Sequence, residues 1–115
     1  MVDVPRASTT VDVFNAIAER RRRDILDVLH DGEAAVGDLV DRLSLAQPDV
    51  SKHLKVLRDV GLVTSRTEGR QRIYRVQALA LRPLHDWVSQ FEQMWNERYD
   101  RLDDLLVELN QEDEH

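Results

Sequence analysis

Hydrogen-bonding and cationic side chains recur at helical spacing between positions 47 and 58, and their types suit contacts with nucleic acid. One face of this segment is polar and carries Gln47, Ser51, Lys52, Lys55 and Arg58. The opposite face is apolar at spacings of four and three, which is typical of an α-helix, with Val50, Leu54, Leu57 and Val60. Such a helix can bury its apolar side in a small core and present its polar side to base edges in the DNA major groove. We therefore interpret it as a recognition helix.

The residues before this helix predict a supporting helix. Apolar residues between 36 and 43 recur with helical periodicity at Val36, Leu39, Val40 and Leu43. Residues 44–46 then leave room only for a tight link. At the other end, Gly61 can adopt the left-handed conformation that stops a helix. The sequence thus predicts a helix, a short turn and a second helix.

The residues after Gly61 predict a basic β-hairpin. Residues 62–66 and 71–76 are rich in β-prone types and flank a predicted turn at residues 67–70. A hairpin that follows a recognition helix is a wing. Four arginines lie on it, where they could reach phosphates or a minor groove: Arg66, Arg70, Arg72 and Arg75.

These segments together resemble the ArsR family of dimeric winged-helix repressors. The resemblance covers roughly residues 11 to 76 and is carried by VSKHLKVLRDVGLV at 50–63, EGRQRIYRV at 68–76, and the upstream pairs Val13-Phe14, Ile17-Ala18, Arg22-Arg23 and Ile25-Leu26. The C-terminal portion is similar to a cysteine-free, autorepressor-like branch of that family. The resemblance implies a mainly α fold with a small β-hairpin, in which a winged helix-turn-helix is followed by a long C-terminal dimerisation helix.

We expect three groups of residues to contact double-stranded DNA. The candidates for base edges or nearby phosphates are Gln47, Ser51, Lys52 and His53. The recognition-helix candidates for phosphates are Lys55 and Arg58, and the wing candidates are Arg66, Arg70 and Arg72.

The start of the recognition helix departs from the family pattern. Related sequences usually have Ser or Thr where this chain has Ala46, and alanine cannot cap a helix. Asp49, at the third helical position, is expected to remake the cap. Two further roles for Asp49 at the DNA interface are a hydrogen bond from a cytosine amino group and repulsion at wrong sites.

The C-terminal part predicts one continuous helix of 27 residues from Pro83 to Leu109, roughly 40 Å long. A core of this size cannot cover its apolar stripe, so we expect a second copy of the chain to do so. The predicted homodimer interface comprises Phe14, Leu84, Trp87, Val88, Phe91, Trp95, Leu102, Leu105 and Leu109. The aromatic residues could instead line a pocket for a small molecule, although no effector is specified by the sequence.

Charge is distributed unevenly along the chain. The net charge is −6 overall, but residues 47–75 hold seven Lys and Arg against three acids, whereas residues 76–115 hold three against ten. The cationic excess therefore coincides with the recognition helix and wing, which predicts selective DNA binding by an acidic protein.

Length and composition predict a single domain. We expect an arm at residues 1–9, a winged helix-turn-helix at 10–77, a dimerisation helix at 78–110 and an acidic tail at 111–115. Thr9 or Thr10 is expected to cap the first helix. The arginine run at 20–23 could touch phosphates, but it is interpreted first as a solvated helix face paired with neighbouring acids.

Catalysis, cofactors and metal regulation are not expected. Ser51 and His53 lie two apart on one helix and face different sides, so they cannot act as nucleophile and base. Cysteine is absent, and His85 beside Asp86 is an isolated pair on the last helix. No segment is apolar enough to cross a membrane, and a cytoplasmic location is expected. The alternative from another class is a winged-helix module that binds a protein partner without specific DNA binding.

Overall fold

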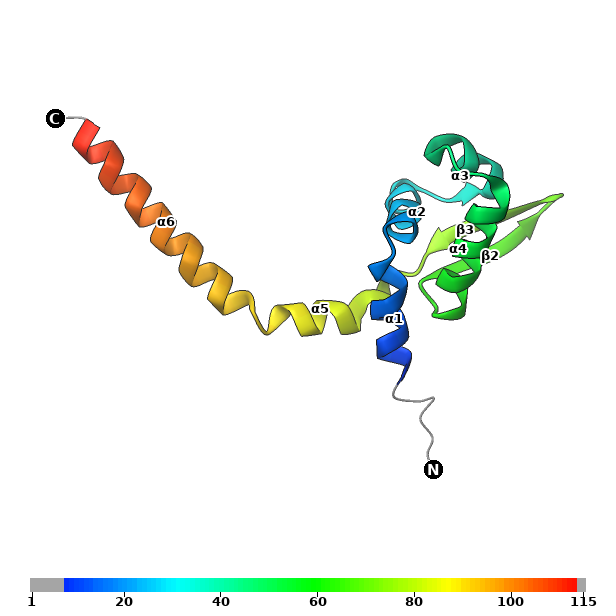
Figure 1. Ribbon diagram of the computed structural model, residues 1–115, viewed down its shortest axis with the longest axis horizontal. Helices are drawn as coiled ribbons and strands as arrows, with labels where there is room; N and C mark the ends of the chain where they lie inside the picture. The colour runs from blue at the N-terminus through cyan, green and yellow to red at the C-terminus, as the bar shows by residue number, and fades with distance from the viewer. Residues whose placement is uncertain (1–7, 114–115) are drawn as a thin grey trace, which may run out of the picture. The chain divides into compact units, whose positions relative to one another are not determined.

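The computed structural model describes residues 8–113, apart from the side chains of residues 8–12, 99–100 and 112–113. The chain divides into two compact units, residues 1–84 and 85–115, each of which is described by itself (Figure 1). The first unit contains helices α1 (Ser8–Ala18), α2 (Arg20–Asp31), α3 (Val36–Leu43) and α4 (Gln47–Asp59), strands β1 (Ala34–Ala35), β2 (Val63–Glu68) and β3 (Gln71–Val76), and the 3-10 turn η2 (Ala78–Leu81). Helix α1 begins at Ser8, earlier than the predicted cap, and most of the predicted arm lies outside the described residues.

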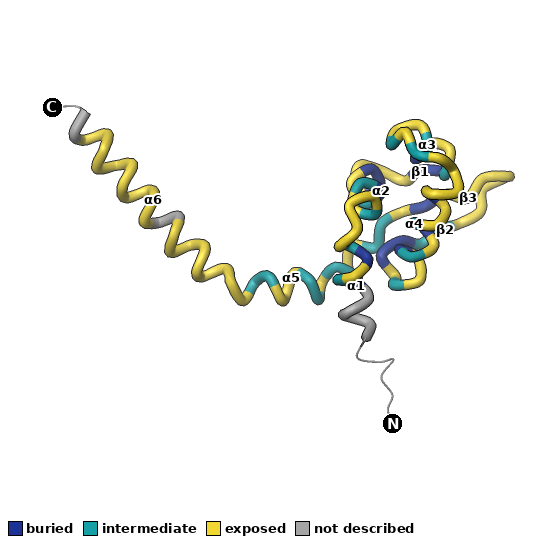
Figure 2. The backbone as a smooth tube through the Cα atoms, in the orientation of Figure 1, coloured by how far each residue is buried: buried dark blue, intermediate teal, exposed yellow. Residues whose placement is uncertain are grey.

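The core of the first unit forms where one face of each helix meets the sheet. Its large fully buried side chains come from α2, α3, α4, the start of β2 and the residue just before β2, as the dark segments of Figure 2 show. They include Ile25, Leu39, Val50, Leu54, Leu57, Leu62 and Val63. Burial of these positions follows the helical periodicity in the sequence and confirms a mainly helical winged-helix fold.

Helices α3 and α4 form the predicted helix-turn-helix. The Asp38 carboxylate accepts a hydrogen bond of 3.2 Å from the Ala35 backbone N–H and so caps the start of α3. Ser44 then adopts a left-handed conformation, with φ 55° and ψ 42°, and ends the helix. The link is therefore three residues long, as the sequence predicts.

Gly61 ends the recognition helix through a Schellman motif. Its φ of 84° is left-handed, its N–H donates to the Arg58 carbonyl at 3.0 Å, and the Leu62 N–H donates to the Leu57 carbonyl at 2.9 Å. The following residue, Leu62, is fully buried. The motif thus turns the chain from the helix into the wing and anchors that turn in the core.

Replacing Gly61 with alanine is expected to destabilise the protein by about 1 to 2 kcal/mol, because a side chain in the left-handed region is strained. No heavy atom lies within 4 Å of a Cβ built at Gly61, so backbone strain alone accounts for the loss. The matched control is Gly37→Ala inside α3, which has equal space and should stabilise by about 0.5 to 1 kcal/mol. Urea denaturation measures both variants, and equal stability of Gly61→Ala and wild type would contradict the motif's role.

The wing is part of a three-stranded antiparallel sheet with strand order β1-β3-β2. The last pair of the hairpin is Glu68 opposite Gln71, which leaves Gly69 and Arg70 as a two-residue turn. Gly69 has φ 63°, and glycine at the first position of such a turn matches the twist of the strands. The sequence prediction began this turn two residues too early, at residue 67, and missed β1, whose two residues carry no strand signal of their own.

The second unit corrects the prediction of one continuous C-terminal helix. Helix α5 (Arg82–Ser89) ends before α6 (Glu92–Asp113) begins, with a turn at Gln90 and Phe91. The Ser89 hydroxyl donates to the His85 carbonyl at 2.7 Å, and the Gln90 side-chain amide donates to the Trp87 carbonyl at 3.0 Å. The Trp87 carbonyl is the one that the Phe91 N–H would use in a continuing helix, and the Phe91 N–H instead donates to the Val88 carbonyl at 3.0 Å, which tightens the chain at the interruption. At the other end α6 continues to Asp113, so most of the predicted acidic tail is helical.

Helix α6 keeps an apolar face in contact with solvent within its own unit. Its described residues are all exposed, and Figure 2 shows the helix without buried segments. The large exposed apolar side chains of α6 are Met94, Trp95, Leu102, Leu105, Leu106, Val107 and Leu109. Beside the turn, the Trp87 and Phe91 rings meet edge to face, 5.3 Å apart between centroids.

Candidate nucleic-acid interface

The recognition helix α4 separates its two faces as the sequence predicts. Val50, Leu54 and Leu57 are buried against the core, which fixes the rotation of the helix about its own axis. The side chains expected to reach DNA from its first half are exposed, namely Gln47, Asp49, Ser51 and Lys52. Together they form a polar surface over the first two turns of α4.

His53 does not belong to that exposed surface. Its side chain is half-buried, and its Nδ1 atom is buried without a hydrogen-bond partner among the described residues. The buried Nδ1 atom is not available to DNA, and a contact through the exposed part of the His53 ring stays a prediction. The structure therefore places His53 apart from the other predicted contacts.

The second half of α4 carries two exposed cations, of which one has an acidic partner and the other has none among the described residues. The Lys55 ammonium forms an ion pair with the Asp59 carboxylate at 2.9 Å, one turn further along the helix. Arg58 has no ion pair or hydrogen bond from its side chain to any part of the chain that the structure describes. Arg58 is thus the less compensated of the two predicted phosphate contacts, although an exposed pair such as Lys55 with Asp59 is weak and can open.

The expected cap by Asp49 is absent from the helix that the structure describes, so that prediction is wrong. Neither Ala46 nor Asp49 provides a side-chain cap, and the Asp49 backbone N–H instead donates to the Ala46 carbonyl at 3.1 Å. Pro48 explains why the helix tolerates this arrangement, because proline in the first turn has no N–H that needs a partner. The Asp49 carboxylate is left exposed at the start of the recognition helix.

The four wing arginines lie in different places. Residues that face each other across an antiparallel pair share a face, and the faces alternate along the strand. Arg72 pairs with Thr67 and lies on the same side as the buried Tyr74, whereas Arg66 and Arg75 lie on the opposite, outer side. Arg70 sits in the turn at the tip.

Arg66 is occupied by two carboxylates. Its Nη1 atom pairs with Glu33, and its Nη2 atom pairs with Glu68 at 2.9 Å. The hydrogen bond from Arg66 lowers the pKa of Glu33, and the bonds to Glu33 and Glu68 raise the pKa of Arg66, so Glu33 and Arg66 both stay charged at neutral pH. In contrast, Arg70 and Arg72 make no ion pair within the described residues. The contact of Arg66 with DNA stays a prediction, for an arginine whose charge is already offset by two carboxylates.

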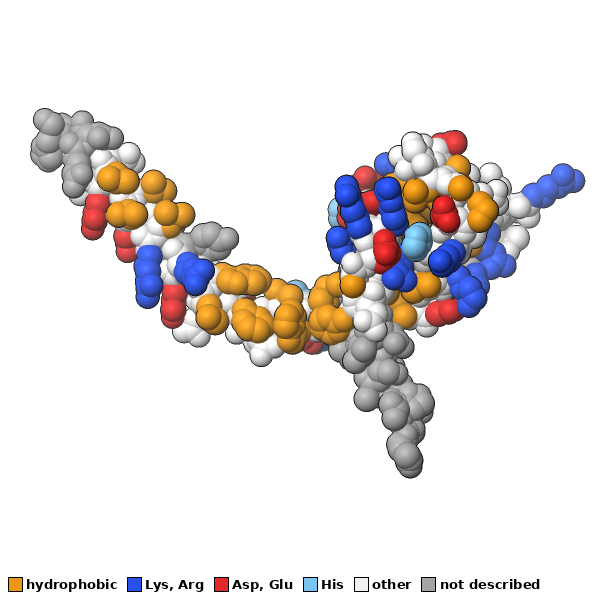
Figure 3. Space-filling model, viewed as in Figure 1, with side chains coloured by type: hydrophobic (Ala, Val, Ile, Leu, Met, Phe, Trp, Pro, Cys, Tyr) orange, Lys and Arg blue, Asp and Glu red, His pale blue; other side chains and the backbone are white. Residues whose placement is uncertain are grey.

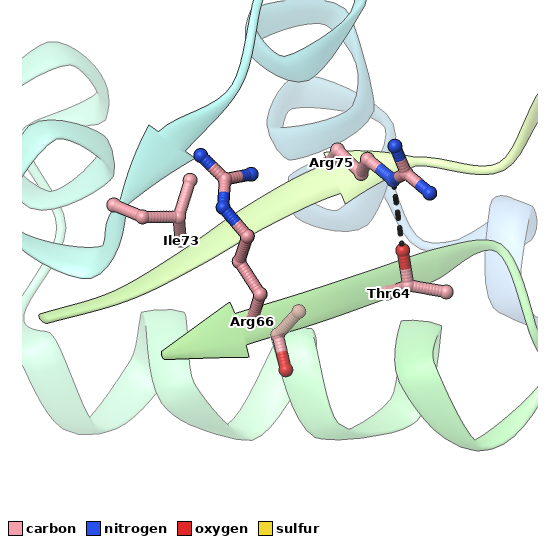
Figure 4. Close-up of a pocket in the computed structure, with 5 residues that line it drawn as sticks. Thr64, Arg66, Ile73 and Arg75 are labelled. Carbon is pink, nitrogen blue, oxygen red and sulfur yellow. Dashed lines mark hydrogen bonds between the residues drawn. The ribbon is translucent and has the colours of Figure 1, made fainter. Parts of the chain in front are cut away.

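The outer side of the wing holds an open hollow of about 280 Å³ between the two strands. Figure 4 shows Arg66 and Arg75 reaching from β2 and β3, with Ile73 beside them. The Arg75 Nε atom donates to the Thr64 hydroxyl at 3.4 Å, which is a long hydrogen bond. The lining residues are Thr64, Ser65, Arg66, Ile73 and Arg75.

The arginine run at 20–23 has largely structural contacts. Arg23 donates from Nη1 to the Ile17 carbonyl at 2.7 Å and to the Ala18 carbonyl at 3.2 Å, which satisfies the end of α1. Arg21 pairs with Asp24 at 3.6 Å, and the Glu19 carboxylate caps α2 through the Arg21 N–H. Of these side-chain contacts, only the pair of Arg21 with Asp24 is the pairing with an acid that the sequence interpretation expected.

The described residues show neither a metal cluster nor a membrane helix. No group of three or more His, Cys, Asp or Glu side chains comes together among them, and His85 with Asp86 is an exposed pair at 3.5 Å. None of the described helices is both long and apolar enough to cross a bilayer. Independence from metals stays a prediction.

Basic side chains therefore gather on the unit that carries the helix-turn-helix and the wing, and Figure 3 shows them at the wing tip. A helix-turn-helix followed by a basic wing defines the winged-helix class of protein. The family model described as "Bacterial regulatory protein, arsR family" matches residues 19–65. The chain belongs to the ArsR family of transcriptional regulators, as the sequence resemblance predicts.

Known relatives match about two thirds of the chain. The chain is 37% identical over 78 residues to the HTH-type transcriptional regulator Rv2034 of Mycobacterium tuberculosis. This aligned region covers 68% of this chain and 73% of the relative. It is 29% identical over 80 residues to the transcriptional repressor SdpR of Bacillus subtilis, covering 70% and 89%. Both relatives are named as regulators of transcription.

Solved structures agree with this assignment. The structure of HlyU from Vibrio cholerae matches with a TM-score of 0.62 and 32% identity, covering 75% of this chain and 94% of that one. An ArsR-like transcriptional regulator from Rhodococcus sp. RHA1 matches with a TM-score of 0.68 and 25% identity, covering 89% and 96%. The fold therefore extends over most of both neighbours.

Proposed function

We propose that this chain is a homodimeric, sequence-specific DNA-binding repressor that occupies an imperfect palindromic operator. The observation that carries the proposal is the exposed polar face of α4 next in sequence to a wing whose Arg70 and Arg72 lack acidic partners in the described structure. Base edges would be read from Gln47, Ser51 and Lys52. Phosphates would be held by Arg58, Arg70 and Arg72, with Lys55 as a weaker contributor.

A second copy of the chain would cover the apolar face of α6. Leu102, Leu105 and Leu109 repeat at alternating spacings of three and four, which is the seam of a paired helix. Exposed apolar stripes of this length normally meet a partner. Trp95, seven residues before Leu102, lies on the same face of α6. The remaining residues of the predicted interface are Phe14, Leu84, Trp87, Val88 and Phe91.

Two-fold pairing would determine the form of the operator. Two recognition helices related by a dyad read half-sites separated by about one turn of DNA, or about 34 Å. The operator should then be an inverted repeat, and binding should block transcription when the site overlaps a promoter.

Selection from a randomised pool of DNA duplexes tests the proposed function. The wild-type chain should enrich an inverted repeat, and the enriched duplex should shift as one complex that contains two chains. Enrichment of no sequence, with binding to all duplexes alike or to none, would reject it and favour the protein-interaction module.

Binding of the selected duplex should weaken with salt, and Arg72→Ala should reduce both the affinity and the log-log salt slope, the latter by about 0.9 for each phosphate that the variant no longer neutralises. Lys55→Ala should change the slope less, because Asp59 already neutralises part of its charge. Arg21→Ala is the matched control, since Arg21 is an exposed arginine paired with Asp24 on α2. Fluorescence anisotropy at several salt concentrations measures the slopes. A wild-type slope in Arg72→Ala would remove Arg72 from the interface.

A further inference from the structure

Arg66 crosses the wing sheet from one edge to the other. It lies on β2 opposite Ile73 of β3, and Ile73 lies opposite Ala35 of β1. Its guanidinium nevertheless pairs with Glu33, two residues before Ala35 on the far side of β3. The arginine stem thus passes over the middle strand, where Ile73 is half-buried.

This contact joins two edge strands of the sheet that do not pair with each other. Strand β1 contributes only two residues to the sheet, Ala34 and Ala35, and α3 begins at the next residue. Strand β2 lies at the opposite edge and pairs only with β3. Glu33 is 33 positions from Arg66 in the sequence, so their contact directly links the segment that leads into the helix-turn-helix with the wing.

We propose that Glu33 and Arg66 form a brace that positions the wing relative to the helix-turn-helix, and that Arg66 acts on DNA binding through this brace and not by contact with a phosphate. The inference rests on the proposed DNA binding. Arg66 stands between Glu33 and Glu68, so the three groups together carry a net charge of −1 and offer no excess of positive charge. Glu33 and Arg66 are positioning residues, whereas Arg70 and Arg72 are contacts.

If the brace exists, removal of the Glu33 charge should change the affinity for DNA in the direction opposite to the one that simple electrostatics predicts. Removing the Glu33 charge makes the protein less acidic, which by itself should strengthen attraction to DNA. If Glu33 competed with a phosphate for Arg66, its removal would also strengthen binding. Loss of a brace instead weakens specific binding, because the wing then has to be ordered when DNA binds.

Glu33→Gln and Arg66→Gln are each expected to weaken binding to the selected duplex about 3- to 5-fold, the upper range for an exposed ion pair. The double variant should be no weaker than either single variant, because both remove the same contact. The matched control is Glu68→Gln, which removes a carboxylate from the same arginine but leaves the link to Glu33, and it should change affinity less than about 2-fold. The salt slope should stay at the wild-type value in Arg66→Gln, in contrast to Arg72→Ala.

Hydrogen exchange of the full chain without DNA provides the second readout. Amides of the wing between Thr64 and Arg75 should exchange faster in Glu33→Gln and Arg66→Gln, while amides of α4 keep their wild-type rates. Tighter or unchanged DNA binding by Glu33→Gln, a slope reduced in Arg66→Gln as in Arg72→Ala, or unchanged wing exchange would each overturn the brace. A wild-type chain that selects no duplex would reject the proposed function, and the exchange measurement would still decide whether the brace exists.

Discussion

A chain carrying both Leu102→Asp and Leu105→Asp is expected to be monomeric and to bind the selected duplex about 100-fold more weakly, or worse. Both leucines are 50% exposed within the second unit and lie on one face of α6. Carboxylates there would be buried without partners if a second copy packed on that face. A monomer engages only one half-site at a time. It therefore loses the gain in affinity that comes from binding two linked half-sites, which is about 10² to 10⁴.

The matched control for this double variant is Val107→Asp. Val107 is 54% exposed on the same helix but lies away from the stripe formed by Leu102, Leu105 and Leu109. It introduces one carboxylate in place of two, and Val and Asp have similar helix propensities, so the helix should be little changed and the chain should remain dimeric. Light scattering gives the mass, and thermal unfolding reports whether the winged-helix core is retained. A folded dimer of the double variant would locate the interface elsewhere.

Local signals in the sequence were sufficient to predict the helix-turn-helix and the wing. Burial of Val50, Leu54 and Leu57 follows directly from their spacing, and Gly61 has the left-handed φ that its position after the helix requires. The exposed surface of α4 follows from the same periodicity, because fixing the buried face also fixes the polar one. These features depend on residues close together in the chain, which is why they were predictable.

Features that depend on specific side-chain bonds were not predictable. No proline or glycine marks the interruption between α5 and α6, where the side chains of Ser89 and Gln90 bind backbone carbonyls. Nothing in the sequence indicated the ion pair of Glu33, since its partner Arg66 is distant in sequence and becomes a neighbour only when the sheet forms. For the same reason the wing arginines could be counted from the sequence but not divided into paired and unpaired ones.

Asp38 and Asp49 show how the same pattern can give two outcomes. Each is the third residue of its helix and follows an alanine at the cap position, yet only Asp38 accepts a hydrogen bond from that alanine's N–H. Helix α4 differs in having Pro48 in its first turn. Because proline has no backbone N–H, α4 has one fewer N–H group that lacks a partner within the helix. Asp49 is therefore available for a role other than capping.

Asp49→Ala should leave the stability of the protein closer to the wild-type value than Asp38→Ala does. Loss of the Asp38 bond should cost about 1 kcal/mol, as for other helix caps. Loss of the Asp49 charge removes only a favourable interaction with the helix dipole, about 0.3 to 1 kcal/mol at an exposed site. Thermal unfolding of the two variants side by side measures the difference, and an equal loss would restore the capping role.

The larger effect of Asp49→Asn should be on discrimination between DNA sequences. Asp49 is exposed at the start of the recognition helix, where a carboxylate can set specificity if it meets phosphates or acceptor groups on wrong sequences but not at the selected site. Asparagine removes the charge with little change in shape, so affinity for scrambled DNA should rise while affinity for the selected duplex changes little. The ratio of the two should fall about 10-fold, near the lower end of the roughly 1 to 3 kcal/mol that one misread base pair costs.

If Asp49 instead accepts a hydrogen bond from a cytosine, the same ratio falls because the selected duplex binds more weakly and one base pair becomes tolerant of substitution. Titration of both duplexes with wild type and Asp49→Asn separates these causes, and an unchanged ratio would show that Asp49 takes no part in specificity.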